Sequence, residues 1–287
     1  MLLSAFLKDG MRRLEAVYPA PEARSILAML CGEVLGVAPY AHLVEPGHAV
    51  APGKEPLLED ALSRLCEGEP IQYVLGKAAF CGRDFRVSPA VLIPRPETEL
   101  LCREAATLAA PGMSVLDLCT GSGNIAWTMA LSVEGARVVG VDISEEALSI
   151  ARSQPFSGEC SDGRFRAPEF VRADILLPPE GLAEESFGLV LSNPPYIRAS
   201  EKAAMRRNVL DYEPAGALFV PDADPLVFYR AVAEWSVRLM APSGTGFTEI
   251  NEELGLSVKA LFSSFGFSNV LIIKDFYGKD RIVRYCR

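Results

Sequence analysis

Strand-like and helix-like segments alternate through the centre of the chain, and this alternation restricts the possible folds more than any other feature. Short apolar runs typical of buried strands occupy residues 114–118, 136–142 and 187–192. Segments with helical spacing of apolar residues accompany these runs, at 97–110, 124–132 and 144–154. Because parallel strands are usually joined by a helix, we predict an α/β fold with a mostly parallel sheet covered on both faces.

The two ends of the chain differ from this centre. Residues 269–287 predict two long strands joined at Gly278, which would form a C-terminal antiparallel pair. Apolar residues within 1–70 recur at helical spacing, which predicts a small all-α N-terminal domain. Short strand-like pieces in 71–93 are typical of a β-hairpin linker. The predicted organisation is therefore a helical domain, this linker and a larger domain over 94–287.

Composition and charge argue against several classes of function. A net charge of −9 over 287 residues, with no run of five like charges, argues against tight sequence-independent binding to duplex nucleic acid. The seven cysteines form no CxxC pair and are expected to be reduced thiols, and two histidines provide no metal motif. No apolar run reaches transmembrane length, and the apolar start is expected to form an amphipathic helix. We expect a soluble cytoplasmic monomer without metal, membrane or direct nucleic-acid binding.

A glycine-containing loop follows the first of the central strands. Gly121 and Gly123 lie between a predicted strand and a predicted helix, where backbone N–H groups can bind an anionic group. Asp142 ends the next strand, and a carboxylate there suits the two hydroxyls of a ribose. A tight strand-to-helix turn with a capping aspartate would also explain this pattern. The loop fits a nicotinamide dinucleotide or S-adenosylmethionine, and Asp117 favours the latter because a carboxylate attracts its ammonium group.

The sequence Asn193-Pro194-Pro195-Tyr196 directly follows a predicted strand, on the same edge of the sheet as the glycine loop. A planar NH₂ group is a poor nucleophile, so its methylation requires positioning and charge stabilisation. The side-chain carbonyl of Asn193 and the backbone carbonyl of Pro194 could accept its two N–H bonds. Tyr196 could supply a flat face against the amide or base. The alternative interpretation is a rigid polyproline-like connection.

Several segments resemble a known enzyme family. The sequences DLCTGSG, VDIS and SNPPYI resemble class I S-adenosylmethionine-dependent methyltransferases of the amino-methylating type, with their Rossmann-like fold. Residues 68–101 and the segment DYEPAGALF resemble the release factor glutamine methyltransferases, and the similarity extends from about residue 66 to the end. The resemblance implies methylation of the side-chain amide N5 of the glutamine in the Gly-Gly-Gln motif of peptide-chain release factors. It also implies that the helical domain recognises this substrate.

The resemblance also implies a set of site residues. Asn193 and the run Pro194-Pro195-Tyr196 would hold the glutamine. The residues expected at the cofactor are Arg95, Asp117, Cys119, Thr120, Gly121, Ser122, Gly123, Asp142, Asp174, Ile175 and Asn193. By composition alone, Arg95 and Glu97 could instead form a solvated ion pair.

Two positions depart from the family pattern. Cys119 stands where the family usually has glycine, and we expect this residue to narrow the loop without adopting a positive φ. Residues 220–225, VPDADP, replace a segment that tends to contain glycines in the family.

Three other functions remain to be weighed. An amino methyltransferase acting on adenine N6 or guanine N2 meets the same planar NH₂ problem, but the chain shows no basic recognition domain. A nicotinamide-dependent oxidoreductase would explain the glycine loop and leave the Asn-Pro-Pro-Tyr motif unused. A non-catalytic S-adenosylmethionine-binding module would be expected to have a damaged motif, and here the motif is intact.

Overall fold

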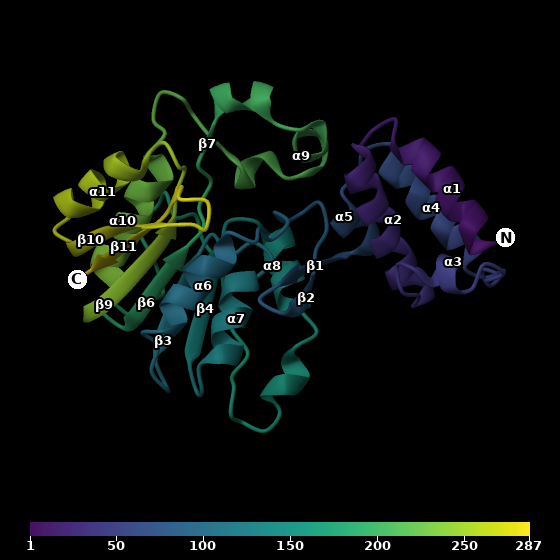
Figure 1. Ribbon diagram of the computed structural model, residues 1–287. Coiled ribbons are helices and arrows are strands. Elements are labelled where there is room, and N and C mark those ends of the chain that lie inside the picture. The colour runs from purple at the N-terminus through teal and green to yellow at the C-terminus, as the bar shows by residue number, and fades with distance from the viewer. The chain divides into compact units, whose positions relative to one another are not determined.

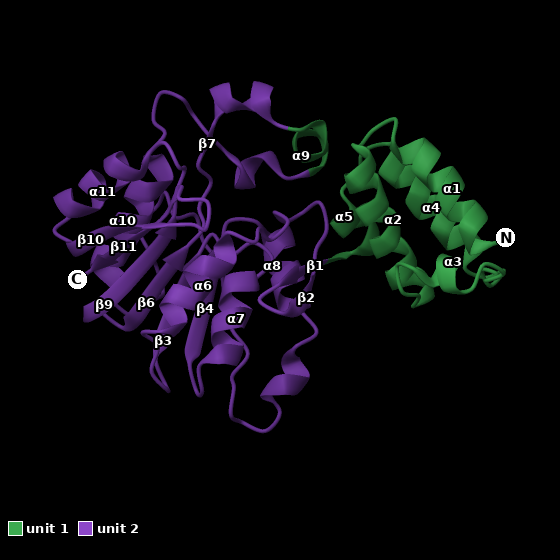
Figure 2. Ribbon diagram, in the orientation of Figure 1, with its two compact units in different colours: residues 1–77, 206–212 green, residues 78–205, 213–287 purple.

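The computed structural model describes residues 1–287, whose elements are labelled in Figure 1. Contacts divide the chain into two compact units, shown in Figure 2. Unit 1 consists of Met1–Lys77 and Arg206–Tyr212, and unit 2 consists of Ala78–Met205 and Glu213–Arg287. The division predicted from the sequence, with a linker over 71–93, stays a prediction.

Unit 1 is a small helical bundle. Its helices are α1 (Leu3–Leu14), α2 (Ala20–Leu35), α3 (Ala41–Val44), α4 (Glu55–Cys66), α5 (Ile71–Leu75) and α9 (Arg207–Tyr212). The bundle has a core of its own, in which Leu3, Leu14, Leu30, Leu58 and Leu62 are almost completely buried. Pro21 lies in the first turn of α2, where its missing N–H costs nothing, and Gly36 ends this helix in a left-handed conformation.

Unit 2 contains a seven-stranded sheet in the order β10-β11-β9-β6-β3-β4-β5. Its strands are β3 (Ser114–Leu118), β4 (Arg137–Asp142), β5 (Glu169–Arg172), β6 (Phe187–Ser192), β9 (Met240–Glu249), β10 (Ser268–Lys274) and β11 (Asp280–Cys286). Strands β5, β4, β3, β6 and β9 run parallel, and β11 is antiparallel to both β9 and β10. The predicted α/β class, mostly parallel sheet and C-terminal antiparallel pair are confirmed.

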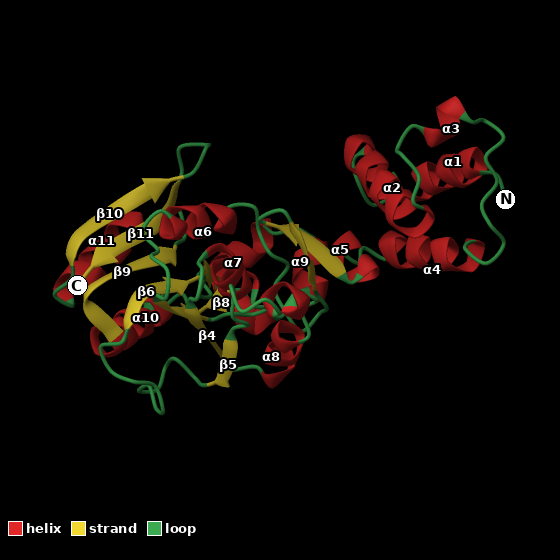
Figure 3. Ribbon diagram, turned by 90° about the horizontal axis from the view of Figure 1, so that it is seen from below, coloured by secondary structure: helices red, strands yellow, loops and turns green.

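Helices cover both faces of this sheet, as Figure 3 shows. They are α6 (Thr98–Ala106), α7 (Asn124–Ser132), α8 (Glu145–Arg152), α10 (Val227–Leu239) and α11 (Gly255–Ser264). Neighbouring strand residues enter different cores: Val115 packs in the core that contains α6 and α7, and Leu116 in the core that contains α10 and α11. A strand buried on both faces is apolar at most positions, which explains the nearly continuous apolar runs in the sequence.

Four short strands lie outside this sheet. Strands β1 (Lys77–Phe80) and β2 (Arg83–Arg86) form one pair, and β7 (Ile197–Arg198) and β8 (Phe219–Val220) form a parallel pair. No helix is long and apolar enough to cross a membrane.

Candidate active site

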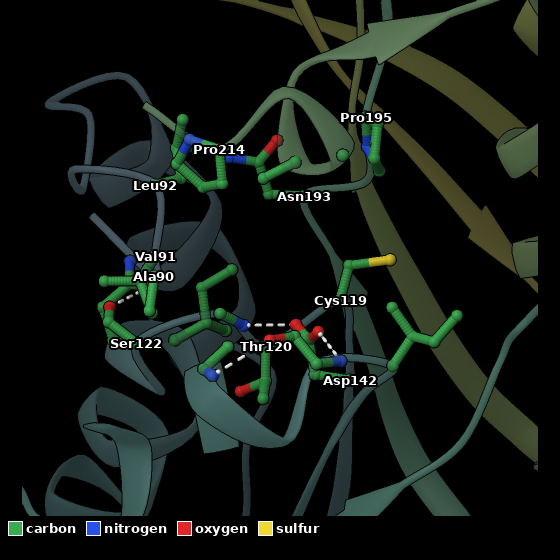
Figure 4. A pocket seen from close by; sticks show the side chains of 18 of the residues that line it. Ala90, Val91, Leu92, Cys119, Thr120, Ser122, Asp142, Asn193, Pro195 and Pro214 are labelled. Atoms are coloured by element: carbon green, nitrogen blue, oxygen red, sulfur yellow. Dashed lines mark hydrogen bonds between the residues drawn. The ribbon is translucent and has the colours of Figure 1, made fainter. Parts of the chain in front are cut away.

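A cavity of about 480 Å³ opens at the carboxyl ends of β3, β4 and β6. The order of the strands reverses here, because the chain passes from β3 to β4 on one side and β6 joins β3 on the other. Open α/β sheets bind ligands at such a point. Nine of the residues predicted for the cofactor line this cavity: Arg95, Cys119, Thr120, Gly121, Ser122, Asp142, Asp174, Ile175 and Asn193. In the view of Figure 4, Cys119 lies between Asn193 and Asp142.

Asp142 is anchored by the backbone of two loops. Gly121 N donates to its Oδ2 at 2.8 Å, and Ser144 N donates to its Oδ1 at 3.0 Å. Burial raises the pKa of this carboxyl, and the backbone N–H donors act in the opposite direction. Each oxygen of the carboxylate keeps capacity for a further donor. Asp142 is therefore held rigidly at the cavity and can accept hydrogen bonds from a ligand.

Asp117 lies beneath the glycine loop and does not line the cavity. Its Oδ2 accepts from Thr120 Oγ1 at 2.5 Å and from Ala126 N at 3.1 Å, so it ties the loop to the first turn of α7. Its Oδ1 is buried without a protein partner. Burial raises the pKa of Asp117 to about 7. The predicted contact between Asp117 and an ammonium group stays a prediction.

Gly123 also lies behind the cavity and caps the N-terminus of α7 with a φ of 77°. A Cβ at this position would come within 3.0 Å of Ala151 Cβ and of the Phe170 ring. The glycine therefore permits close packing of the loop against the elements beside it. Gln154 fixes the same loop from another side, because its Nε2 donates to the carbonyl of Ser122 at 3.0 Å.

Cys119 adopts a left-handed conformation, with a φ of 62°. Our expectation that this position would avoid a positive φ is therefore wrong. The Cβ of an L-residue in this region crowds the following carbonyl, at a cost of roughly 1–2 kcal/mol. Burial and the nearby carboxylates of Asp142 and Asp117 raise the pKa of the thiol well above its usual range. Cys119 is thus a strained, protonated residue in the wall of the cavity.

The Asn-Pro-Pro-Tyr motif divides between the cavity and the protein interior. Asn193 and Pro195 line the cavity, whereas Pro194 and Tyr196 do not. Asn193 Nδ2 donates to Thr98 Oγ1 at 3.2 Å, and the Tyr196 hydroxyl donates to Glu249 at 3.0 Å. The motif is therefore fixed from two sides, and the role predicted for the Tyr196 ring stays a prediction.

Arg95 lines the cavity near the start of α6. Its guanidinium forms an ion pair with Glu213 at 2.5 Å, and Glu213 also accepts from the backbone N–H of Ile93 at 3.2 Å. The partner of Arg95 is thus a buried carboxylate far along the chain, and the alternative pair with Glu97 is not formed.

Several residues that build the site were not singled out in the sequence. Thr98 bonds to Asn193, Glu213 to Arg95, and Glu249 to Tyr196. The two residues of each pair are far apart in the chain, and Glu249 also bonds to Thr98. Thr98 and Glu213 lie in segments quoted only for their resemblance to the family, and Glu249 carried no signal. The apolar wall of the cavity was also missed, and includes Val91, Leu92, Ile143, Leu176 and Phe228.

Unit 1 contains a second cavity of about 560 Å³. Glu22, Glu67, Asp211 and the arginines at 206 and 207 contribute to its lining. Glu22 is paired with Arg206 at 2.8 Å. This cavity has no glycine loop and no strand end, so the cavity of unit 2 is the stronger candidate for an active site.

The residues of the unit 2 cavity fit S-adenosylmethionine. Asp142 offers acceptors for ribose hydroxyls, and Ile143 and Ile175 offer apolar surface for a base. Asp117 places a carboxyl group beneath the loop, and its Oδ1 has no protein partner. No group of three or more His, Cys, Asp or Glu side chains that could hold a metal ion is present.

Comparison with known proteins agrees with this geometry. A family model described as a methyltransferase domain matches residues 109–233, and one described as the PrmC N-terminal domain matches residues 5–76. Fold and match together define a class I methyltransferase, the class that takes its methyl group from S-adenosylmethionine.

The relatives narrow this class. A release factor glutamine methyltransferase from Bacteroides thetaiotaomicron is 40% identical over 98% of this chain and 98% of its own length. One from Flavobacterium psychrophilum is 38% identical over 79% of this chain and 78% of its own. The chain therefore belongs to the release factor glutamine methyltransferase family, which confirms the resemblance seen in the sequence.

A solved structure of a release factor-specific protein-(glutamine-N5) methyltransferase from Alicyclobacillus acidocaldarius is also similar. It is 29% identical, covers 71% of this chain and 99% of its own, and aligns with a TM-score of 0.40.

Proposed function

We propose that this protein transfers a methyl group from S-adenosylmethionine to the side-chain amide N5 of the glutamine in the Gly-Gly-Gln motif of peptide-chain release factors. Membership of the family supports the substrate class. The structural observation that carries the proposal is that Asn193 and Pro195 line the same cavity as the glycine loop and Asp142. The Asn193 side chain, which we propose binds the amide, thus lies in the same cavity as the residues that we propose bind the cofactor.

The chain's task in this reaction is to position a weak nucleophile. The bound cofactor supplies a methyl group on a positively charged sulfur, which is already strongly electrophilic. The Asn193 side-chain carbonyl and the Pro194 backbone carbonyl accept the two N–H bonds of the substrate amide. These acceptors hold the amide nitrogen toward the cofactor and stabilise the positive charge that develops on it.

Other residues of the cavity would hold the cofactor. Asp142 would accept from the ribose hydroxyls, Ile175 would flank the adenine, and the loop from Cys119 to Ser122 would hold the methionine part. Burial of these groups in a cavity with apolar walls strengthens each hydrogen bond relative to water. Arg95, paired with Glu213, lines the same cavity.

The helical domain would recognise the release factor. Unit 1 has its own core and contributes no residue to the cavity in unit 2. Because the enzyme must select a protein rather than a free amino acid, a separate domain for substrate recognition is consistent with this arrangement. We assign this role to the predicted domain over residues 1–70.

Substitution of Asn193 by alanine tests the proposal. Loss of one preorganised partner of the transition state should lower the single-turnover rate by roughly 10²–10³. S-adenosylmethionine affinity, measured by calorimetry, should change by less than about tenfold, or 1.4 kcal/mol. The rate is measured with labelled cofactor and an unmodified release factor, and mass spectrometry locates the added methyl group.

The control is Asn269→Ala, an exposed asparagine in β10 outside the cavity, which should keep the wild-type rate. A wild-type rate in Asn193→Ala, or a methyl group on any residue other than the Gly-Gly-Gln glutamine, would contradict the proposal.

A further inference from the structure

A hydrogen-bonded chain connects three elements behind the candidate active site. Thr98 Oγ1, at the start of α6, donates to Glu249 Oε2, at the end of β9, at 2.7 Å. Asn193 Nδ2, after β6, donates to the same Thr98 oxygen at 3.2 Å. Thr98 and Glu249 are each only 1% exposed. Water therefore does not compete for these groups, and each depends on its partners in the protein.

The number of protons available for hydrogen bonding determines which group donates and which accepts between Asn193, Thr98 and Glu249. The single hydroxyl proton of Thr98 is donated to Glu249, and while Glu249 is ionised its carboxylate can only accept. Thr98 can then only accept from Asn193, which requires the NH₂ group of the asparagine on that side. One end of the asparagine amide is an NH₂ donor and the other is a carbonyl acceptor. With the NH₂ group bonded to Thr98, the carbonyl oxygen is the end that faces the cavity lined by Asn193.

Burial favours the protonated form of Glu249, whereas its hydrogen-bond donors and a nearby positive charge favour the ionised form. Its other oxygen accepts from the Tyr196 hydroxyl, and Arg281 in the neighbouring strand β11 places a positive charge nearby. Burial and the charge of Glu97 act in the opposite direction, and the pKa of Glu249 is raised overall. Glu249 thus binds the last residue of the Asn-Pro-Pro-Tyr motif directly and the first residue through Thr98.

We propose that Thr98, held by Glu249, is a positioning residue that fixes the Asn193 amide with its carbonyl toward the substrate and so makes the site select glutamine over glutamate. This inference rests on the proposed methyl transfer to glutamine. A glutamine side chain offers N–H donors to the Asn193 carbonyl. A glutamate carboxylate offers only acceptors. Because the Asn193 amide cannot rotate to present its NH₂ group, it has no donor for this carboxylate.

The test compares Thr98→Val with Thr98→Ser. Valine keeps the branched shape of threonine and removes its hydroxyl, so Asn193 becomes free to turn, whereas serine keeps the hydroxyl. Two quantities are measured: the single-turnover rate, and the ratio of affinities for a release factor and for the same factor with its Gly-Gly-Gln glutamine changed to glutamate. Thr98→Val should lower both the rate and the ratio about tenfold, the effect of one hydrogen bond. Thr98→Ser should stay within about threefold of wild type.

Thr107→Val is the matched control, because Thr107 follows the same helix and its hydroxyl bonds only the carbonyl of Glu104. Glu249→Gln is measured in parallel. A glutamine at position 249 could donate to Thr98, and Thr98 could then donate to Asn193 and turn the Asn193 amide over. This variant should therefore also lower the ratio of the two affinities. Calorimetry with S-adenosylmethionine shows that each variant is folded, and should Thr98→Val fail to fold, Glu249→Gln decides.

A folded Thr98→Val or Glu249→Gln protein with the wild-type ratio overturns the inference. Absence of methyl transfer by the wild-type protein would instead overturn the proposed function, so the two failures are distinguishable.

Discussion

Cys119 shows how a single residue can strain a functional loop. It is one of four non-glycine residues with a positive φ, and of these four it alone lines the cavity. Left-handed backbone is inexpensive for glycine and costly for a residue with a Cβ. The strain persists because Thr120 and Gly121 on its C-terminal side are fixed by hydrogen bonds to Val141, Asp117 and Asp142.

We predict that Cys119→Gly is more stable than Cys119→Ala by about 0.5–1 kcal/mol. Removal of the Cβ releases roughly 1–2 kcal/mol of strain, and the greater freedom of glycine in the unfolded chain offsets about half of it. Both variants lose the thiol, so the difference isolates the backbone term. Urea unfolding measures it.

The same pair at Cys31, inside α2, serves as the control. There alanine should be the more stable residue by about 1 kcal/mol, because the backbone is helical. If the alanine variant were more stable than the glycine variant at position 119 as well, Cys119 would not be strained.

At the level of single residues, the sequence predicted the site residues that directly follow strands. It did not predict the residues that hold them in place. Asp142 and Asn193 could be predicted because the position at a strand's end implies the binding edge of the sheet. Thr98 and Glu249 are separated by 151 residues, and nothing in either local pattern indicates the other. Such a pair is created by tertiary packing and could be predicted only with knowledge of how α6 and β9 meet.

At the level of elements, the beginning of α7 depends on two glycines with different surroundings. Gly121 has a φ of 53° and open space where a Cβ would be, and Gly123 has a φ of 77° and two neighbours at 3.0 Å. The two positions therefore separate backbone strain from close packing of the helix.

We predict that Gly121→Ala lowers the free energy of unfolding by about 0.5–1 kcal/mol, because the greater freedom of glycine in the unfolded chain offsets about half of the roughly 1–2 kcal/mol cost of left-handed alanine. Gly123→Ala should cost about 1–3 kcal/mol more, because the added methyl group also forces Ala151 and Phe170 to move. Thermal and urea unfolding of the two variants without ligand provide the comparison. Equal losses would mean that the packing around Gly123 relaxes freely.

Strand β9 shows why some elements escaped prediction. It contains Pro242, Gly244 and Gly246, which are typical of turns, and no strand was predicted there. In the structure, a Cβ on Gly246 would lie 2.0 Å from the Tyr285 ring, so the glycine makes room for an aromatic residue of β11. A glycine selected for such a close approach cannot be distinguished from a turn glycine by local sequence.

At the level of the whole molecule, the class of the fold was accessible because strands and helices alternate over a long stretch. The continuous apolar runs of the strands and the helical spacing of apolar residues in the helices both follow from burial of the sheet on both faces. The return of the chain to unit 1 at residues 206–212 was not predicted, because this short segment has no pattern of its own.

The net charge of −9 leads to a prediction about salt. An enzyme that neutralises several phosphates of a nucleic acid loses substrate affinity steeply as salt rises. This protein should show only a shallow dependence of release-factor affinity between 50 and 200 mM salt, well below the roughly 10³-fold loss expected for six phosphate contacts. Binding is measured by calorimetry, and methyl transfer to DNA or ribosomal RNA is assayed beside it. Robust transfer to adenine or guanine would favour the nucleic-acid alternative.

The division of unit 1 into two stretches has a consequence for the time course of synthesis. Unit 1 includes α1 to α5 and also Arg206–Tyr212, where Arg206 pairs with Glu22 and the Tyr212 hydroxyl donates to the carbonyl of Glu67. The ribosome therefore makes β3 to β6 before it supplies these partners. At ~5–20 residues per second, the interval between Lys77 and Arg206 lasts roughly 6–26 seconds. For that interval a nascent helical unit exists without its final segment, and Glu22 and the carbonyl of Glu67 are open to other partners.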